Sequence, residues 1–264
     1  MTREITRPLH SHAPSQLWPR IRLTWRQALL SVAALFLTLD LTVSLSLGAP
    51  PFSTSFQIVA KSIAKTIGLI ELRDGTLAND KRLLLTLEKQ LQPLDVIVIS
   101  APFKGTSFFT PGRNTHMAIW LGNETDWAKQ GWRDIPRLKP LADAVAEGRS
   151  VLQSDRHGTG LSSLDDVLNA DEITIFRATH QRDAEIHFDR AIQNMGKAYD
   201  YNLDGLDHQT LICTELAMLI FPELRSKPSK RLGRQFILPD EMLRTLEQSD
   251  HWQSWFHAGS TADR

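Results

Sequence analysis

The chain has 264 residues, of which 30 are Lys or Arg and 30 are Asp or Glu, so its formal net charge is zero. This balance excludes the global positive field that is typical of nucleic-acid binders, and we expect no nucleic-acid partner. The single cysteine excludes an intramolecular disulfide framework, and no Cys/His cluster has the spacing of zinc ligands. We therefore expect neither a metal nor a cofactor, and one catalytic domain of ordinary size.

The first 49 residues have the composition of a membrane or export segment. Five arginines precede an apolar run over residues 28–47, which is long enough to cross a bilayer. Basic residues of this kind stay in the cytoplasm, so we predict that residues 1–49 are a cytoplasmic stub plus a single-pass transmembrane anchor, with the catalytic domain extracytoplasmic. The alternatives are a cleaved signal peptide, which would release the protein to the periplasm, and a buried globular helix. Asp40 weakens the membrane interpretation without abolishing it.

Residues 50–90 are predicted to form a helical lead-in. Pro50 and Pro51 end the apolar run, and apolar residues then recur at helical spacing over residues 55–72. A second helical pattern covers residues 81–91. We expect this lead-in to pack against the following domain or to hold it away from the membrane.

The remaining residues, 91–264, combine short strands with capped helices. Strands are indicated by apolar, β-branched runs between turn residues, and helices by a period of 3.6 residues with caps, Gly or Pro at their ends. The expected strands are residues 92–99, 116–122, 150–154 and 172–178. The expected helices are residues 141–147, 164–168, 183–195, 213–221 and 239–247.

Cys213 and His116 are the candidate catalytic pair. Cys213 opens an apolar helical run, and a helix start favours a thiolate because free N–H groups and the positive dipole end lie there. Free cysteines also serve simply as buried packing residues, so position alone does not decide. His116 stands at a strand entrance after a loop, where an imidazole can act as the base for a thiol. Neither H-E-x-x-H nor G-x-S-x-G occurs, which argues against a metalloprotease or a serine hydrolase.

Four short motifs in this order resemble a known family. They are Leu-Gln-Pro-Leu-Asp-Val-Ile at residues 91–97, Thr-His-Met-Ala-Ile-Trp-Leu-Gly at 115–122, Gly-Lys-Ala-Tyr-Asp-Tyr at 196–201 and Cys-Thr-Glu-Leu at 213–216. This succession resembles the circularly permuted NlpC-type papain-like amidases, the YiiX/YaeF branch. That family has a Gly-Asp strand, a Ser-His-Val-Gly-Ile strand, a Tyr-Asp segment and a Cys-Ser-Glu-Leu helix. Permutation explains why the histidine precedes the cysteine.

The resemblance implies an α+β fold, a permuted papain-like domain in which an antiparallel sheet packs on the nucleophile helix. It implies Cys213 as nucleophile and His116 as base, with Gln153 orienting the imidazole where many relatives have a carboxylate. Asp155 and His157 lie nearby in the sequence as substitutes for Gln153.

The resemblance also assigns Tyr199 to the substrate cleft, where it would bind substrate and contribute to the oxyanion site, and it makes Asp95 structural. Among the departures from the family pattern, Leu94 replaces glycine, Met117-Ala118 replaces Val-Gly, and Thr214 replaces serine. None of these changes removes a reacting atom.

The function implied is a cysteine amidase or peptidase that cleaves a peptide or acyl-amide substrate through an acyl-thioenzyme. Cell-wall peptides and N-acylated amino compounds are the substrate classes that the family suggests. A lipid ester or thioester hydrolase, or an acyltransferase, would use the same chemistry. A catalytically silent binding module at the cell envelope is the alternative from another class, and the amide at position 153 is its main support.

Overall fold

The computed structural model describes residues 62, 64–108, 110, 112–201, 203, 209–225, 229–231 and 234–259. The chain divides into two units, Met1–Ile58 and Val59–Arg264, and every described residue belongs to the second unit. The predicted membrane segment at residues 28–47 lies outside the described residues. Within the described residues, no helix combines the length and apolarity needed to span a bilayer.

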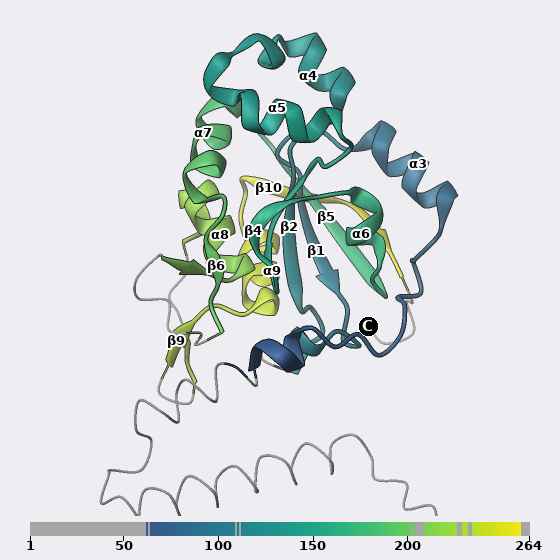
Figure 1. Ribbon diagram of the computed structural model, residues 1–264, viewed down its shortest axis with the longest axis vertical. Coiled ribbons are helices and arrows are strands. Elements are labelled where there is room, and N and C mark those ends of the chain that lie inside the picture. Colours follow the sequence, from purple (N-terminus) through teal and green to yellow (C-terminus); the bar gives the residue numbers. More distant parts are fainter. Residues whose placement is uncertain are drawn as a thin grey trace, which may run out of the picture. The chain divides into compact units, whose positions relative to one another are not determined.

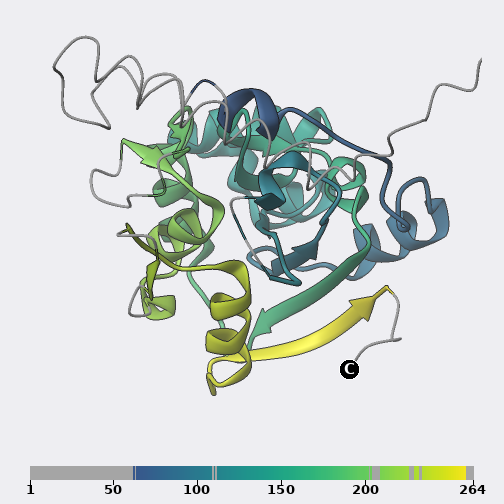
Figure 2. The same ribbon diagram turned by 90° about the horizontal axis from the view of Figure 1, so that it is seen from below.

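A six-stranded sheet with the strand order β10-β5-β1-β2-β3-β4 organises the domain (Figure 1). Every neighbouring pair in this sheet is antiparallel, as predicted. The strands are β1 (Val96–Ser100), β2 (His116–Trp120), β3 (Val151–Asp155), β4 (Gly158–Ser162), β5 (Glu172–Ala178) and β10 (Trp252–Ala258). Figure 2 shows β5 and β10 side by side as a long antiparallel pair. Four of these six strands are predictable from the sequence, whereas β4 and β10 are not.

Three of the described helices begin directly after residues whose side chains cap them. Asp80, Ser163 and Asp183 accept hydrogen bonds from backbone N–H groups at the helix starts that follow them. The helices are α3 (Lys81–Gln90), α4 (Glu124–Gln130), α5 (Lys139–Ala146), α6 (Leu164–Leu168), α7 (Ala184–Asn194), α8 (Cys213–Ile220) and α9 (Pro239–Glu247). Only α4 was not predicted from the sequence among these seven described helices.

Shorter elements join these helices and strands. They are the 3₁₀ turns η1 (Gly105–Phe108), η2 (Trp132–Asp134), η3 (Pro136–Leu138) and η4 (Pro222–Leu224), the parallel pair β6 (Ala198–Tyr199) and β7 (Thr210–Leu211), and the hairpin β8 (Ser229–Arg231) and β9 (Arg234–Phe236).

Both faces of the sheet are covered, so β1 is an unbroken buried run rather than an alternating one. Val98, Met117 and Leu152 point to one face, where they share a core cluster with residues of α5, α7, α8 and α9. Ile97 and Ala118 point to the opposite face and share a second cluster with residues of α3 and α6. Figure 1 shows these two groups of helices on the two sides of the sheet. Because side chains alternate along a strand, His116 belongs to the same face as Ala118.

Leu94 occupies a backbone conformation that usually requires glycine. Its φ is 76°, in the left-handed region, and its N–H donates to the carbonyl of Trp120 at 2.7 Å. The side chain is only 4% exposed and belongs to the core cluster that contains Cys213. Burial of the leucine side chain therefore offsets backbone strain of about 1–2 kcal/mol. This conformation explains why the family pattern has glycine at this position.

We predict that Leu94→Gly will be less destabilising than Leu94→Ala. Both variants lose the buried side chain, at a cost of about 2–5 kcal/mol, but only glycine relieves the left-handed strain. After the unfolded-state entropy of glycine is taken into account, we expect a difference of about 0.5–1 kcal/mol in the free energy of unfolding, measured by urea denaturation. At Leu87, a buried residue within α3, the same pair of substitutions should show the opposite order. The Ala variant being the more stable at both positions would refute this account of Leu94.

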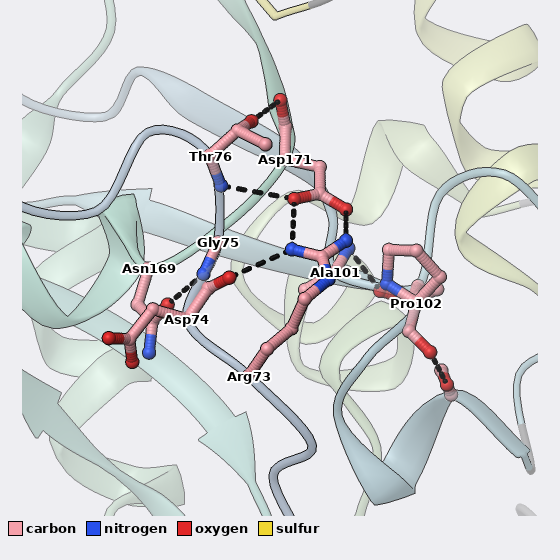
Figure 3. A network of polar contacts seen from close by, with 10 residues as sticks. Arg73, Asp74, Gly75, Thr76, Ala101, Pro102, Asn169 and Asp171 are labelled. Atoms are coloured by element: carbon pink, nitrogen blue, oxygen red, sulfur yellow. Dashed lines mark hydrogen bonds and ion pairs between the residues drawn. The ribbon is translucent and has the colours of Figure 1, made fainter.

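Residues 70–79, which we call the strap, are the part of the predicted lead-in that directly precedes α3. Arg73 donates two hydrogen bonds to the carboxylate of Asp171, at 2.8 and 2.6 Å, and Thr76 bonds to Asp171 through its N–H and its hydroxyl (Figure 3). The N–H of Gly75 donates to Oδ1 of Asn169 at 2.6 Å. A Cβ on Gly75 would lie 2.3–2.5 Å from the backbone of Ala170, so only glycine fits there. The strap is therefore docked by specific contacts.

We predict that Arg73→Ala will loosen the strap without unfolding the domain. The bidentate bond is half-exposed and screened by solvent, so its loss should cost about 1 kcal/mol, which corresponds to roughly fivefold more frequent local opening. Hydrogen exchange at the amides of Gly75 and Leu77, which donate to Asn169 and Ala170, measures this opening directly. Arg133→Ala, which removes an exposed ion pair with Glu124, serves as the control. Unchanged protection in Arg73→Ala would mean that the ion pair does not hold the strap.

Candidate active site

Cys213 is held at the start of α8 by contacts that fix the helix against the sheet. The hydroxyl of Ser154, on β3, donates to the carbonyl of Leu211 at 2.7 Å. The N–H of Ile212 donates to the carboxylate of Glu215 at 2.9 Å, which caps the first turn. The hydroxyl of Thr214 donates to the carbonyl of Ile237 at 2.8 Å, just before α9. These bonds set the position of the sulfur relative to β2 and β3.

The sulfur of Cys213 lies against the backbone of β2. The backbone N–H groups of Met117, the residue that follows His116, of Thr214 and of Cys213 itself lie close enough to the sulfur to lower the pKa of the thiol. Met117 lies one residue beyond Ala118, where the pairing between β2 and β3 ends, so its amide is available to the sulfur. Residue 213 is only 4% exposed, and this burial raises the pKa of the thiol to about 12, although the N–H groups favour the thiolate. At neutral pH the resting side chain is a thiol.

His116 is hydrogen-bonded to Gln153, the residue to which the resemblance assigns the orienting role. The ring Nε2 of His116 lies 2.8 Å from Oε1 of Gln153. The amide nitrogen of Gln153 lies 2.9 Å from the hydroxyl of Ser162 and 3.5 Å from Oδ2 of Asp155. A carboxylate only accepts hydrogen bonds, so the NH₂ group of Gln153 faces Asp155 and its carbonyl oxygen faces the imidazole. In the neutral imidazole, Nε2–H therefore donates to Gln153 and Nδ1 keeps its lone pair.

The imidazole of His116 is poised to act as a neutral base. Burial lowers the pKa of His116, the hydrogen bond that the ring donates to Gln153 and the charge of Asp155 raise it, and the charge of Lys104 lowers it further. Burial dominates, so the pKa lies below its ordinary value. A neutral ring with a free Nδ1 is the form that can accept a proton from a thiol.

A cavity of about 680 Å³ lies at this end of the sheet. His116, Gln153 and Tyr199 line it, whereas Cys213 is not part of the lining. Glu71 and Asp74 of the strap contribute another part of the wall. The segment upstream of the sheet therefore helps to form the cavity beside the imidazole.

Tyr199 contributes a protonated hydroxyl to this cavity. Burial, followed by the proximity of Cys213, raises the pKa of the phenol well above its ordinary value. The ring packs edge-on against Tyr201, with centroids 4.9 Å apart. A phenol that stays protonated is a hydrogen-bond donor at neutral pH, which is what binding a carbonyl oxygen requires.

The structure thus brings three predicted site residues to one cavity and sets the fourth, Cys213, against the strand that carries His116. Asp155 contacts Gln153 rather than His116, and His157 has its ring beside Arg156. Asp95 forms a buried ion pair with Arg177, which agrees with the structural role assigned to it. Sequence reasoning missed Ser162 because it lies on β4, a strand whose two glycines look like a turn.

The fold and these contacts define a class of protein: a papain-like cysteine hydrolase with the histidine strand ahead of the cysteine helix. The model of one family matches residues 90–254 and is described as the permuted papain-like amidase enzymes, YaeF/YiiX, C92 family. The chain belongs to this family, which confirms the resemblance found in its sequence. It is accordingly a papain-like cysteine amidase or peptidase, a hydrolase of amide bonds. No curated protein and no solved structure matches the chain significantly.

We predict that substitutions of Gln153 will move the acidic limb of the pH profile in opposite directions. A base role for His116 needs the neutral ring, so kcat/KM should be lost as the pH falls through the pKa of His116, which burial lowers. Gln153→Ala removes a bond that raises this pKa, so the limb should move to lower pH and kcat should fall about tenfold or more. Gln153→Glu places a carboxylate beside the ring and should move the limb up by about 1 unit or more.

Gln193→Glu, on the exposed surface of α7, controls for added negative charge. Movement of the limb in the same direction in both Gln153 variants would contradict the assigned hydrogen bond.

Proposed function

We propose that the chain hydrolyses an amide bond through an acyl-thioenzyme, with Cys213 as nucleophile, His116 as base and acid, Gln153 as the positioning residue and Tyr199 as a substrate-binding residue. The observation that carries this proposal is the hydrogen bond between His116 and Gln153, because it leaves Nδ1 free to act as a base. The contact between the Cys213 sulfur and the amide that follows His116 supports the same assignment.

The proposed reaction begins with transfer of the thiol proton of Cys213 to Nδ1 of His116 as the sulfur attacks the amide carbonyl carbon. The resulting oxyanion accepts hydrogen bonds from the N–H of Cys213 and the hydroxyl of Tyr199. The C–N bond then breaks, and the imidazolium gives its proton to the leaving amine. Water, deprotonated by His116, attacks the thioester, so that the acid product leaves and the thiol is restored.

Cell-wall peptides and N-acylated amino compounds are the substrates that we propose. The cavity is lined largely by charged, hydroxyl and amide side chains, including Glu71, Asp155 and Ser162, which suits a polar substrate. A long lipid chain would find few apolar partners there, so the polar lining argues against the lipid ester, thioester or acyltransferase alternative. The silent binding module remains the contrasting hypothesis.

A substrate-mimicking thiol electrophile separates an enzyme from a silent module. At pH 7 a thiol whose pKa is about 12 reacts slowly unless a base assists it. We therefore expect the wild type to be labelled at Cys213 at least about 100-fold faster than His116→Ala, with labelling followed by intact-protein mass spectrometry. His157→Ala, which removes an exposed histidine nearby, should behave as the wild type does. Equal labelling rates in the wild type and His116→Ala would support the silent module.

Digestion of purified peptidoglycan, N-acylated amino acids and a panel of lipid amides and thioesters would then identify the substrate class. Products that form with the wild type and disappear with Cys213→Ala count as enzymatic. Release of amines from the polar substrates is expected, whereas turnover confined to the lipid panel would overturn the proposed substrate class.

We also propose that the protein is held at the cell membrane, with its catalytic domain extracytoplasmic, or is released to the periplasm. This location rests on the sequence of residues 1–49, and the membrane is the partner that it implies. Fractionation of cells that express the full chain, or the chain without these residues, tests the location. A full chain found in the cytosol would contradict it.

A further inference from the structure

Lys104 brings a positive charge into the cavity beside the proposed catalytic base. It follows β1, and its backbone forms an isolated bridge with Glu71 of the strap. Its side chain is partly buried and lines the same cavity as His116 and Gln153. Neither the proposed mechanism nor the family motifs use this residue.

The ammonium group of Lys104 has no direct anionic partner in the part of the chain that the structure describes. Among the described residues, none lies within hydrogen-bond or ion-pair distance of its Nζ, and the Phe103 ring centroid is 5.9 Å away. The other cation in the cavity wall, Arg156, pairs with Glu71. Partial burial without a partner disfavours the charged form, and accordingly burial lowers the pKa of Lys104. An anion in the cavity would offset this cost.

The carboxylates around Lys104 are already engaged by other groups. Glu71 accepts hydrogen bonds from Arg156 and Asn169. Asp155 accepts one from the N–H of His157. Asp166 accepts two from Ser163 in the cap of α6. These three carboxylates act on Lys104 only through their charge. The N–H donors of the Lys104 ammonium group have no acceptor among the described residues.

We propose that Lys104 is a specificity-determining residue that binds a carboxylate group of the substrate. This inference rests on the proposed function and deepens it, because it selects amides that carry a free carboxylate, such as N-acylated amino acids and peptides with a free C-terminus. Both Lys104 and His116 line one cavity, so a substrate held by its carboxylate there has its amide near the base.

The wider lining limits how much negative charge the substrate can carry. Asp74 and Asp165 stand exposed among the lining residues, and no hydrogen bond or ion pair joins either side chain to another described residue. Their like charge opposes a polyanion, so we expect a substrate with one carboxylate to be preferred over one with several.

Matched substrates test the proposal. N-acetylated peptides would be prepared with either a free C-terminal carboxylate or a C-terminal carboxamide, and kcat and KM would be measured for each by mass spectrometry. The wild type is expected to favour the carboxylate about tenfold in kcat/KM, mainly through KM. Lys104→Gln should reduce this ratio to within about twofold, and Lys104→Arg should keep part of it. Lys139→Gln, an exposed lysine on α5, should leave the ratio unchanged.

The outcomes separate this inference from the proposed function. Wild-type turnover with equal rates on both substrates, or faster turnover of the carboxamide, would overturn the role of Lys104 and leave the amidase intact. A preference that survives in Lys104→Gln would also overturn it. Absence of turnover on every substrate, together with labelling of Cys213 that is independent of His116, would overturn the proposed function itself.

A second measurement covers the case in which Lys104→Gln does not fold. An N-acetylated amino acid should slow the labelling of wild-type Cys213, and its carboxamide counterpart should do so at least several-fold more weakly. Equal protection by the two compounds would contradict the proposal.

Discussion

The hydrogen bond between His116 and Gln153 is the interaction on which the rest of the site depends. It joins two strands at the place where their pairing ends, and it fixes which ring nitrogen carries the proton. Ser162 and Asp155 in turn determine which way the amide points, so three strands cooperate to present one lone pair. An amide holds this tautomer without adding a charge, which allows burial to keep the imidazole neutral.

At Cys213, the proposed nucleophile, backbone groups and burial have opposite effects on the pKa. Three backbone N–H groups favour the thiolate of Cys213, yet burial outweighs them and the thiol stays protonated. Burial thus acts against both members of a charged thiolate–imidazolium pair. A proton transfer that accompanies attack on the substrate depends on the orientation of His116 more than a preformed ion pair would.

Much of the fold could be predicted because its signals are local. The ends of α6 and α7 follow from Ser163 and Asp183, whose side chains cap the helices that follow, and β1 and β5 are apolar runs between turn residues. β4 was missed because its glycines lower strand propensity; pairing with β3 and backbone hydrogen bonds between Thr159 and residues 196–197 hold it. β10 was missed because its partner β5 lies more than 70 residues earlier in the chain.

The candidate site, like the fold, contains residues that could be predicted from local sequence patterns and residues that could not. Cys213 and His116 were identifiable from the sequence because a thiol at a helix start and an imidazole at a strand entrance each have a local pattern. Ser162 and Lys104 had no such pattern. Ser162 matters because it contacts Gln153, and Lys104 matters because its ammonium group lacks a described partner; both features arise only in the folded chain. Leu94 shows the limit most clearly: its departure from the family glycine was visible in the sequence, but the positive φ that explains the glycine was not.

The proposed reacting groups and part of the cavity wall come from different segments of this chain. The family model matches residues 90–254, and all four proposed site residues lie inside that range. Glu71 and Asp74 lie before it, yet they line the cavity, and the contacts of Arg73 and Gly75 hold them there. Because residues outside the matched range form part of the wall, relatives with the same reacting groups but a different upstream segment would present a different cavity. Substrate preference can then change through the strap while the geometry around His116 is preserved.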